Sequence, residues 1–104
     1  MYSIVLATVP TKDVGVQLAR ELVDRRLAAC VNILPATSVY RWEGEVKEDE
    51  EHLLVIKTRR TFVDDIRDLF DELHPYDLPE VIALEIEDGS ADYLNWIRDE
   101  TEMD

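Results

Sequence analysis

The stretch from Leu27 to Lys57 constrains the fold more than any other part of the 104-residue chain. Its apolar ends and polar middle indicate two strands that fold back on each other through a charged turn at Lys47–Glu51. Pro35 is expected to interrupt the first strand, which resumes at Ser38, because proline cannot donate a hydrogen bond to a sheet. A hairpin this long and apolar is not stable alone in water, so we expect it to pack against other strands and other copies of the chain.

The composition is that of a single globular domain spanning residues 1–104. Hydrophobic residues make up 46% of the chain and charged residues 34%, which is too apolar a mixture for a disordered protein. A chain of this length builds one hydrophobic core. No apolar run is long enough to span a membrane, the N-terminus lacks a basic leader, and the single cysteine fits a reducing compartment. We therefore expect a cytoplasmic protein with no membrane partner.

The chain is strongly acidic. Its 24 Asp and Glu residues outnumber its 11 Lys and Arg residues, which gives a formal net charge of −13. Such a surface repels nucleic-acid phosphates and anionic lipids, so neither is expected as a partner. We interpret most of the acidity as a halophilic surface, because molar salt screens the repulsion between carboxylates. The alternative is a dedicated polyanionic surface that binds cations.

Three helices are predicted by apolar residues that recur at a spacing of three or four. The first covers Asp13–Arg26, and Thr11 is its expected N-cap. The second follows Thr61, its expected cap, and carries a clear apolar stripe. Ser90 is expected to cap a short third helix, after which the residues from Glu100 to Asp104 fray.

Four strands are predicted by runs of apolar and β-branched residues. They cover Ser3–Val9, Leu27–Leu34 with its continuation from Ser38, His52–Arg59 and Val81–Glu87. The last strand follows a loop at His74–Glu80, whose two prolines exclude helix. The element order matches an α+β, ferredoxin-like split βαβ sandwich with an antiparallel sheet and an added C-terminal helix.

The sheet is expected to be apolar on both faces, although two helices can cover only one. Uninterrupted apolar runs such as Leu53–Ile56 and Val81–Leu84 place apolar side chains on either side of a strand. No remaining segment is large enough to cover the second face. Self-association through this face and the long hairpin is therefore expected.

Several segments resemble the CutA family, and the resemblance covers nearly the whole chain. They are Ala28–Ile33, Ser38–Gly44, Lys57–Thr58, His74–Glu80 and Tyr93–Trp96. The resemblance implies a compact homotrimer of ferredoxin-like subunits whose long hairpins pack across subunit boundaries. This assembly is similar to that of the trimeric PII signalling proteins, which bind small effectors between subunits. The resemblance also implies a role in tolerance to divalent cations, copper in particular.

Two residues are candidate metal ligands. The thiolate of Cys30 suits Cu(I), although a strand cysteine beside alanine and valine also fits a small buried hydrophobe. His74 could ligate a metal or carry a proton, or backbone groups at a helix end could satisfy it. Copper-binding CutA members carry a cysteine in the first strand and a second histidine before the His-Pro-Tyr motif. Ala7 and Leu73 occupy these positions here, so the resemblance does not carry that ligand set over.

A ligand cleft is the second type of candidate site. Its candidate lining residues are Tyr40, Trp42, Lys57, Tyr76, Glu80 and Trp96. Aromatic side chains also dominate subunit interfaces, so both interpretations remain open. Lys57 lies on an apolar strand and needs a partner if it is buried, which Glu80 or a carboxylate of another subunit would supply. His52 follows three acidic residues, where a solvated turn is a simpler interpretation than a loose cation site.

The sequence contains no recognisable catalytic motif. It has no nucleophile elbow, glycine-rich phosphate loop or paired-cysteine zinc pattern, so we expect no enzyme. The first hypothesis is a cytoplasmic homotrimer in divalent metal-ion tolerance that binds a cation, copper being the candidate, at an intersubunit site. The alternatives are a PII-like sensor with a small effector in its intersubunit clefts, and a trimeric scaffold that binds neither.

Overall fold

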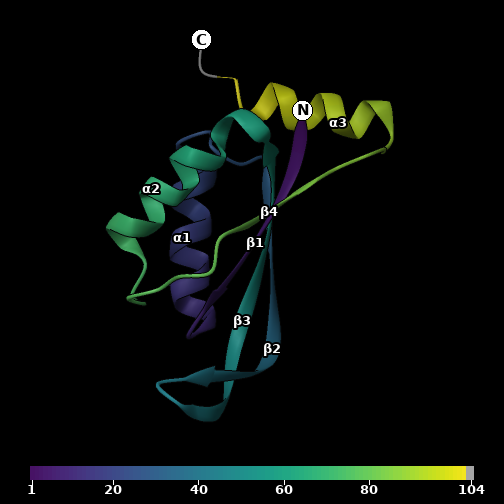
Figure 1. The fold of residues 1–104 in the computed structure, drawn as a ribbon. Coiled ribbons are helices and arrows are strands. Elements are labelled where there is room, and N and C mark those ends of the chain that lie inside the picture. Colours follow the sequence, from purple (N-terminus) through teal and green to yellow (C-terminus); the bar gives the residue numbers. More distant parts are fainter. Residues whose placement is uncertain (103–104) are drawn as a thin grey trace.

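The computed structural model describes residues 1–102 and shows an α+β fold built on one four-stranded antiparallel sheet (Figure 1). The elements are β1 (Tyr2–Val9), α1 (Lys12–Asp24), β2 (Cys30–Trp42), β3 (Glu45–Arg59), a 3₁₀ turn (Arg60–Phe62), α2 (Val63–Leu73), β4 (Ile82–Glu85) and α3 (Ala91–Glu100). The strand order β2-β3-β1-β4 is that of a split βαβ sandwich, so the predicted subunit fold is confirmed.

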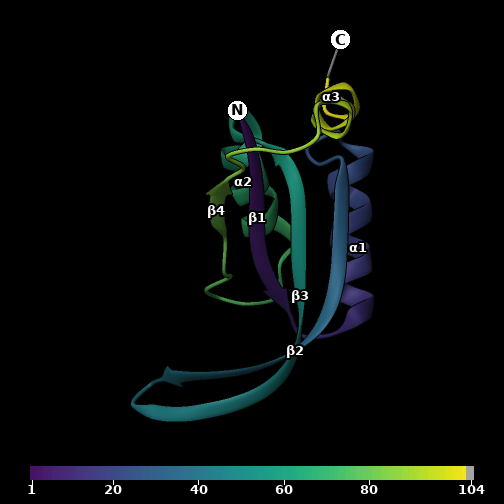
Figure 2. The same cartoon turned by 90° about the vertical axis from the view of Figure 1, so that its right-hand side faces the viewer.

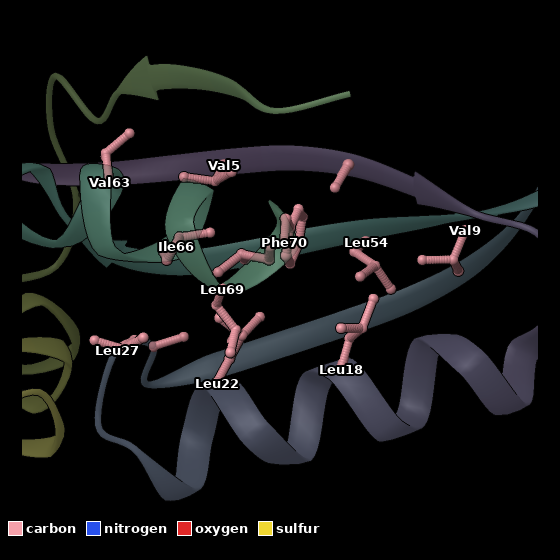
Figure 3. Packing of buried hydrophobic residues seen from close by; sticks show 13 residues of the cluster. Val5, Val9, Leu18, Leu22, Leu27, Leu54, Val63, Ile66, Leu69 and Phe70 are labelled. Carbon is pink, nitrogen blue, oxygen red and sulfur yellow. The ribbon is translucent and has the colours of Figure 1, made fainter. Parts of the chain in front are cut away.

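One face of the sheet carries the hydrophobic core. Burial alternates along β1, where Val5, Ala7 and Val9 are fully buried and the residues between them are only partly buried, as Ile4 is. Figure 1 shows α1 and α2 on the same side of the sheet, and Figure 3 shows their apolar side chains meeting the strands. The helices contribute Leu18 and Leu22 from α1, and Val63, Ile66, Leu69 and Phe70 from α2.

Gly15 lets α1 approach the sheet closely. A Cβ atom at this position would lie 3.2 Å from side-chain atoms of both Leu54 and Val9. The glycine weakens the helix by propensity alone, but it removes the side chain that would hold α1 away from the core. This contact could not be predicted from the sequence, because it depends on which face of the helix meets the sheet.

The hairpin of β2 and β3 extends beyond the last residue pair between β3 and β1, Val9↔His52. This outer part, residues 36–51, forms a curved arm (Figure 2). The register runs without interruption to the pair Trp42↔Glu45, so the turn consists of Glu43 and Gly44 alone. Their φ angles of +51° and +82° are those of a type I′ turn. The predicted turn at Lys47–Glu51 is therefore wrong. Those charged residues lie on an exposed arm, where a strand needs no apolar face.

Pro35 does not interrupt β2, which is the second correction to the predicted hairpin. The residue lies inside the continuous strand, opposite His52. Because β2 is the edge strand of the described sheet and pairs there with β3 alone, the missing N–H can lie on the unpaired side and cost no ladder bond. The strand also begins at Cys30 rather than Leu27.

Two of the three predicted helix caps are confirmed. The hydroxyl of Thr11 accepts a hydrogen bond from the amide of Val14 at 3.2 Å, and that of Ser90 accepts one from the amide of Tyr93 at the same distance. The cap at Thr61 is wrong, because this residue lies in the 3₁₀ turn and α2 begins at Val63 without a side-chain cap.

Three boundaries also differ from the predicted ones. The first helix ends at Asp24, and β4 covers only four residues of the predicted Val81–Glu87. Fraying from Glu100 onwards is wrong for Thr101, which is fully buried and accepts a hydrogen bond from Nε of Arg59 at 2.9 Å. Residues 103 and 104 lie outside the described residues.

Within residues 1–102, the second face of the sheet is covered at one end, where α3 crosses it (Figure 1). Ile97 of α3 is fully buried there, apart from the core on the helix side. The rest of this face, called the open face below, is formed by partly buried or exposed apolar side chains. They are Ile4, Leu6, Leu34, Leu53, Val55, Ile82 and Leu84. The expected second apolar face is therefore present.

Candidate functional site

A groove of about 980 Å³ lies between the hairpin arm, the end of β1 and the loop before β4. Figure 2 shows the arm sweeping below this loop. The hairpin contributes residues 38–42 and 49–51, β1 and its end contribute Thr8 and Pro10, and the loop contributes residues 75–78 and Glu80. The arm therefore forms one wall of the groove and the loop forms the other.

Two tyrosine–carboxylate pairs fix the shape of the groove. The Tyr40 hydroxyl donates a hydrogen bond to Asp49 within the arm, and the Tyr76 hydroxyl donates one to Oε2 of Glu51 at 2.6 Å. The second bond joins the two walls. The hydrogen bond to Asp49 raises the pKa of Tyr40, and burial together with Glu51 raises the pKa of Tyr76. Both phenols are therefore neutral at ordinary pH.

The lining of the groove is strongly acidic. Among the described residues, the hairpin supplies three carboxylates and the loop two, and Arg41 supplies the one cationic side chain on the lining. The five carboxylates are Asp49, Glu50, Glu51, Asp77 and Glu80. The guanidinium of Arg41 lies 3.5 Å from the carbonyl oxygen of Gly44, at the tip of the arm. The groove therefore favours a positively charged occupant.

The structure brings together four of the predicted cleft residues. Tyr40, Trp42, Tyr76 and Glu80 line the groove, whereas Lys57 does not. The ammonium of Lys57 donates a hydrogen bond to Asn32 on the open face of the sheet, so Glu80 is not its partner. Trp96 pairs with Tyr93 on α3, with a distance of 5.4 Å between ring centroids, and lies outside the groove.

The acidic residues on the inner wall were missed as site residues because they were assigned to a turn. Asp49 and Glu51 share one face of β3, since successive strand side chains alternate. In the observed register Tyr40 lies diagonally opposite Asp49 on that face. The sequence shows the same alternation, but the predicted turn at Lys47–Glu51 meant that these residues were not assigned to a strand face.

His74 is held by backbone groups through both ring nitrogens. Nδ1 accepts a hydrogen bond from the Tyr76 amide at 3.1 Å, so Nε2 carries the proton and donates it to the carbonyl oxygen of Thr8 at 2.8 Å. The ring is buried and joins the loop to β1. This is the backbone-satisfied interpretation, and metal ligation at His74 requires one of these bonds to break.

Cys30 and His74 lie at opposite ends of the sheet. Cys30 is half-buried opposite Lys57, which pairs with Ile4, whereas His74 contacts Thr8. Ile4 and Thr8 lie four residues apart on β1, so about 13 Å separates the two candidate ligands along the strand, at 3.3 Å per residue. Across residues 1–102, no three His, Cys, Asp or Glu side chains are grouped as a metal site. The two candidate ligands therefore do not form one site within a single chain.

Three other positions are placed plainly by the structure. His52 lies inside β3 opposite Val9 and is half-buried, so the predicted solvated turn is wrong. Its Nδ1 atom is buried with no hydrogen-bond partner within the described chain. Ala7 is fully buried in the core, and Leu73 is exposed at the end of α2.

The three helices α1, α2 and α3 are 13, 11 and 10 residues long. None of those in the described residues has both the length and the apolar character that crossing a bilayer needs.

Comparison with known proteins places the chain in one family. Residues 3–100 match the family described as CutA1 divalent ion tolerance protein. The divalent-cation tolerance protein CutA of Thermus thermophilus is 48% identical over 102 residues, which cover 97% of this chain and 99% of the relative. Chloroplastic CutA of Arabidopsis thaliana is 48% identical over 94% of this chain, but the chain spans only 54% of that longer protein.

Solved structures agree with this assignment. The Thermus thermophilus protein superimposes with a TM-score of 0.94 over 98% of this chain and 100% of its own. A protein of Archaeoglobus fulgidus, called a periplasmic divalent cation tolerance protein, superimposes with a TM-score of 0.96 at 33% identity, over 98% of this chain and 100% of its own. From the family match and these relatives, the chain belongs to the CutA1 divalent ion tolerance family.

Proposed function

We propose that this protein acts in divalent-cation tolerance as a non-catalytic, cytoplasmic homotrimer. Family membership over residues 3–100 carries the proposal, because the similar proteins are named for this role. The single cysteine supports a reducing compartment. The phenols of the groove are paired with carboxylates and held neutral, which supports binding rather than proton transfer.

The apolar surface that a single chain leaves exposed supports the homotrimer. The open face exposes about half of the side chains of Ile82 and Leu84 (50% and 49%), next to apolar neighbours on β1 and β3. The arm carries Val39 and Val46, both 65% exposed, beyond the reach of the core. Isolated exposed apolar residues are ordinary, but a contiguous apolar sheet face beside an arm that also exposes valines is typical of a subunit interface.

The cation, with copper as the candidate, is proposed to bind where subunits meet. One chain holds its candidate ligands His74 and Cys30 apart, so a complete coordination sphere needs donors from a second subunit. The carboxylates of the groove are not grouped as a metal site within residues 1–102, so they attract cations through their charge and not as a coordination sphere.

Calorimetric titration with Cu²⁺ and with Zn²⁺ in molar KCl tests this proposal. The chain offers a matched pair of variants, because His74→Ala removes the candidate ligand and His52→Ala removes the only other histidine. We expect saturable binding at a fixed number of ions per trimer that His74→Ala abolishes and His52→Ala preserves, with both variants folded by circular dichroism. Weak, unsaturable heats that survive His74→Ala would show that the acidic surface merely collects cations.

A small effector in the groove is the second candidate function. The specific observation is a cavity of about 980 Å³ with three aromatic side chains on its lining, those of Tyr40, Trp42 and Tyr76. This volume is within the range of small-molecule sites, and aromatic side chains are common on their linings. The function predicts saturable binding of an organic ligand to the metal-free protein.

A further inference from the structure

The groove combines aromatic faces with carboxylates on two separate walls. Tyr40 and Trp42 stand on the arm and Tyr76 on the loop, and the hydroxyls of both tyrosines are already committed to Asp49 and Glu51. The Tyr76 ring also packs against His74, with 4.9 Å between ring centroids, so the recognition surface consists of Tyr40 and Trp42, which are 41% and 42% exposed, and the part of the Tyr76 ring that His74 leaves open. An aromatic face attracts a cation that has been partly stripped of water, and an alkylammonium loses its water more readily than a metal ion does.

The arrangement of charge disfavours a metal ion as the occupant. Three carboxylates lie on the arm and two on the loop, and no three of them in the described part of the chain are grouped as a metal site. The tyrosines are held neutral, so neither supplies a phenolate ligand. Negative charge on two walls suits a long molecule that carries several positive charges.

The size of the groove also favours an organic cation over a metal ion. A volume of about 980 Å³ is far larger than a hydrated metal ion needs and lies at the upper end of the range for small organic ligands. Asp77 and Glu80, from the loop, make no side-chain hydrogen bond within the described residues, which leaves them free to meet a ligand.

We infer that the groove binds a linear organic polycation of the alkylammonium class, which rests on the groove serving as the effector site proposed above. Its methylene segments lie against Trp42 and the two tyrosine rings. Its ammonium groups meet Asp77 and Glu80 on the loop and the carboxylates of the arm.

Calorimetric titration with spermidine, at the lowest KCl concentration that keeps the protein folded, tests this inference. Triacetylspermidine, which has the same chain and no charge, serves as the matched probe. We expect one spermidine per chain and no binding of triacetylspermidine. Trp42→Leu is expected to weaken spermidine binding about tenfold, the usual scale of a partly desolvated cation–π contact.

A charge-matched pair of variants distinguishes binding in the groove from diffuse attraction to the acidic surface. Asp77→Asn/Glu80→Gln removes two charges from the loop wall, whereas Glu85→Gln/Glu87→Gln removes two exposed charges outside the groove. The first is expected to weaken binding at least about tenfold, the scale of two lost ion pairs, and the second by less than twofold. Equal losses in the two variants would overturn the inference.

The two probes distinguish failure of the ligand class from failure of the effector site. If triacetylspermidine binds and Trp42→Leu abolishes that binding, the effector site stands and the preference for a polycation is wrong. If neither probe binds, or if binding is indifferent to Trp42→Leu, both the ligand class and the effector role of the groove are overturned.

Discussion

At the scale of single residues, the loop before β4 is positioned by two polar contacts rather than by its prolines alone. His74 links it to the backbone of β1, and Tyr76 links it to Glu51 on the hairpin arm. His74 is buried and Tyr76 is half-buried, and polar groups withdrawn from water in this way are usually hydrogen-bonded. The groove exists because these two contacts hold its walls together.

The Tyr76–Glu51 contact predicts how stability changes at alkaline pH. Burial and Glu51 raise the pKa of Tyr76 in the folded protein above the ordinary value of 10. The folded state then keeps its proton where the unfolded state has lost it, so this contribution is complete below pH 10 and is lost as the pH rises above it. Thermal unfolding between pH 8 and 12 should show that decline in the wild type and a flatter one in Tyr76→Phe. Equal slopes would show that the contact does not stabilise the fold.

Residue-level prediction of the site was right about side-chain direction and wrong about position along the strand. Tyr40 and Trp42 share a face because strand side chains alternate, and this was readable from the sequence. Lys57 shares that face of the hairpin too, but it lies opposite Cys30, at the far end of the sheet from the arm. Alternation gives the face, whereas the place of a residue along the hairpin follows from the turn, which was misplaced.

At the scale of elements, the hairpin turn decides the register of the whole arm. The turn was misplaced because Lys47–Glu51 is the most polar segment of the hairpin, and polarity was taken as the sign of a loop. Glu43-Gly44 is a less obvious turn, since glutamate rarely adopts a positive φ. Hydrophobic pattern locates strands in the core, but it carries no information about an arm that leaves the core.

The backbone of this turn predicts the effect of two substitutions. Gly44→Ala should lower the free energy of unfolding by about 1–2 kcal/mol, because a Cβ atom disfavours the left-handed conformation. Glu43→Asn should raise it by about 0.5 kcal/mol, since asparagine tolerates that conformation better. Gly89→Ala is the control, because its Cβ would meet only ordinary contacts of 3.4 Å or more. Urea unfolding measures all three, and a neutral Gly44→Ala would contradict the assigned turn.

At the scale of the whole molecule, the excess of negative charge is mostly uncompensated. Of 24 acidic residues, four form ion pairs within residues 1–102, and every partner in these pairs is substantially exposed. Exposed pairs contribute little, so repulsion between unpaired carboxylates dominates the surface. The subunit fold could be predicted from sequence despite this charge, because the core pattern is independent of it.

Repulsion of this kind predicts that stability depends on salt. Lowering KCl from molar to about 0.1 M lengthens the screening distance from about 3 Å to about 10 Å and exposes each carboxylate to its neighbours. The melting temperature should fall, by about 4–8 °C for each kcal/mol of stability lost in a domain of this size. NaCl should restore it as well as KCl does if screening is the cause. Melting that is insensitive to salt would contradict the halophilic interpretation.

The open face predicts the oligomeric state of the molecule. Light scattering in molar KCl should give three times the chain mass of 12.1 kDa. Leu84→Glu, at a half-exposed position on that face, should give single chains that remain folded, because the charge is tolerated in water and costly in an interface. Val23→Glu, at a similarly exposed apolar position on α1, should leave the mass unchanged. A wild-type mass of one chain would mean that the face is solvated and the trimer is wrong. Dissociation by Val23→Glu alone would instead place the interface on the helices.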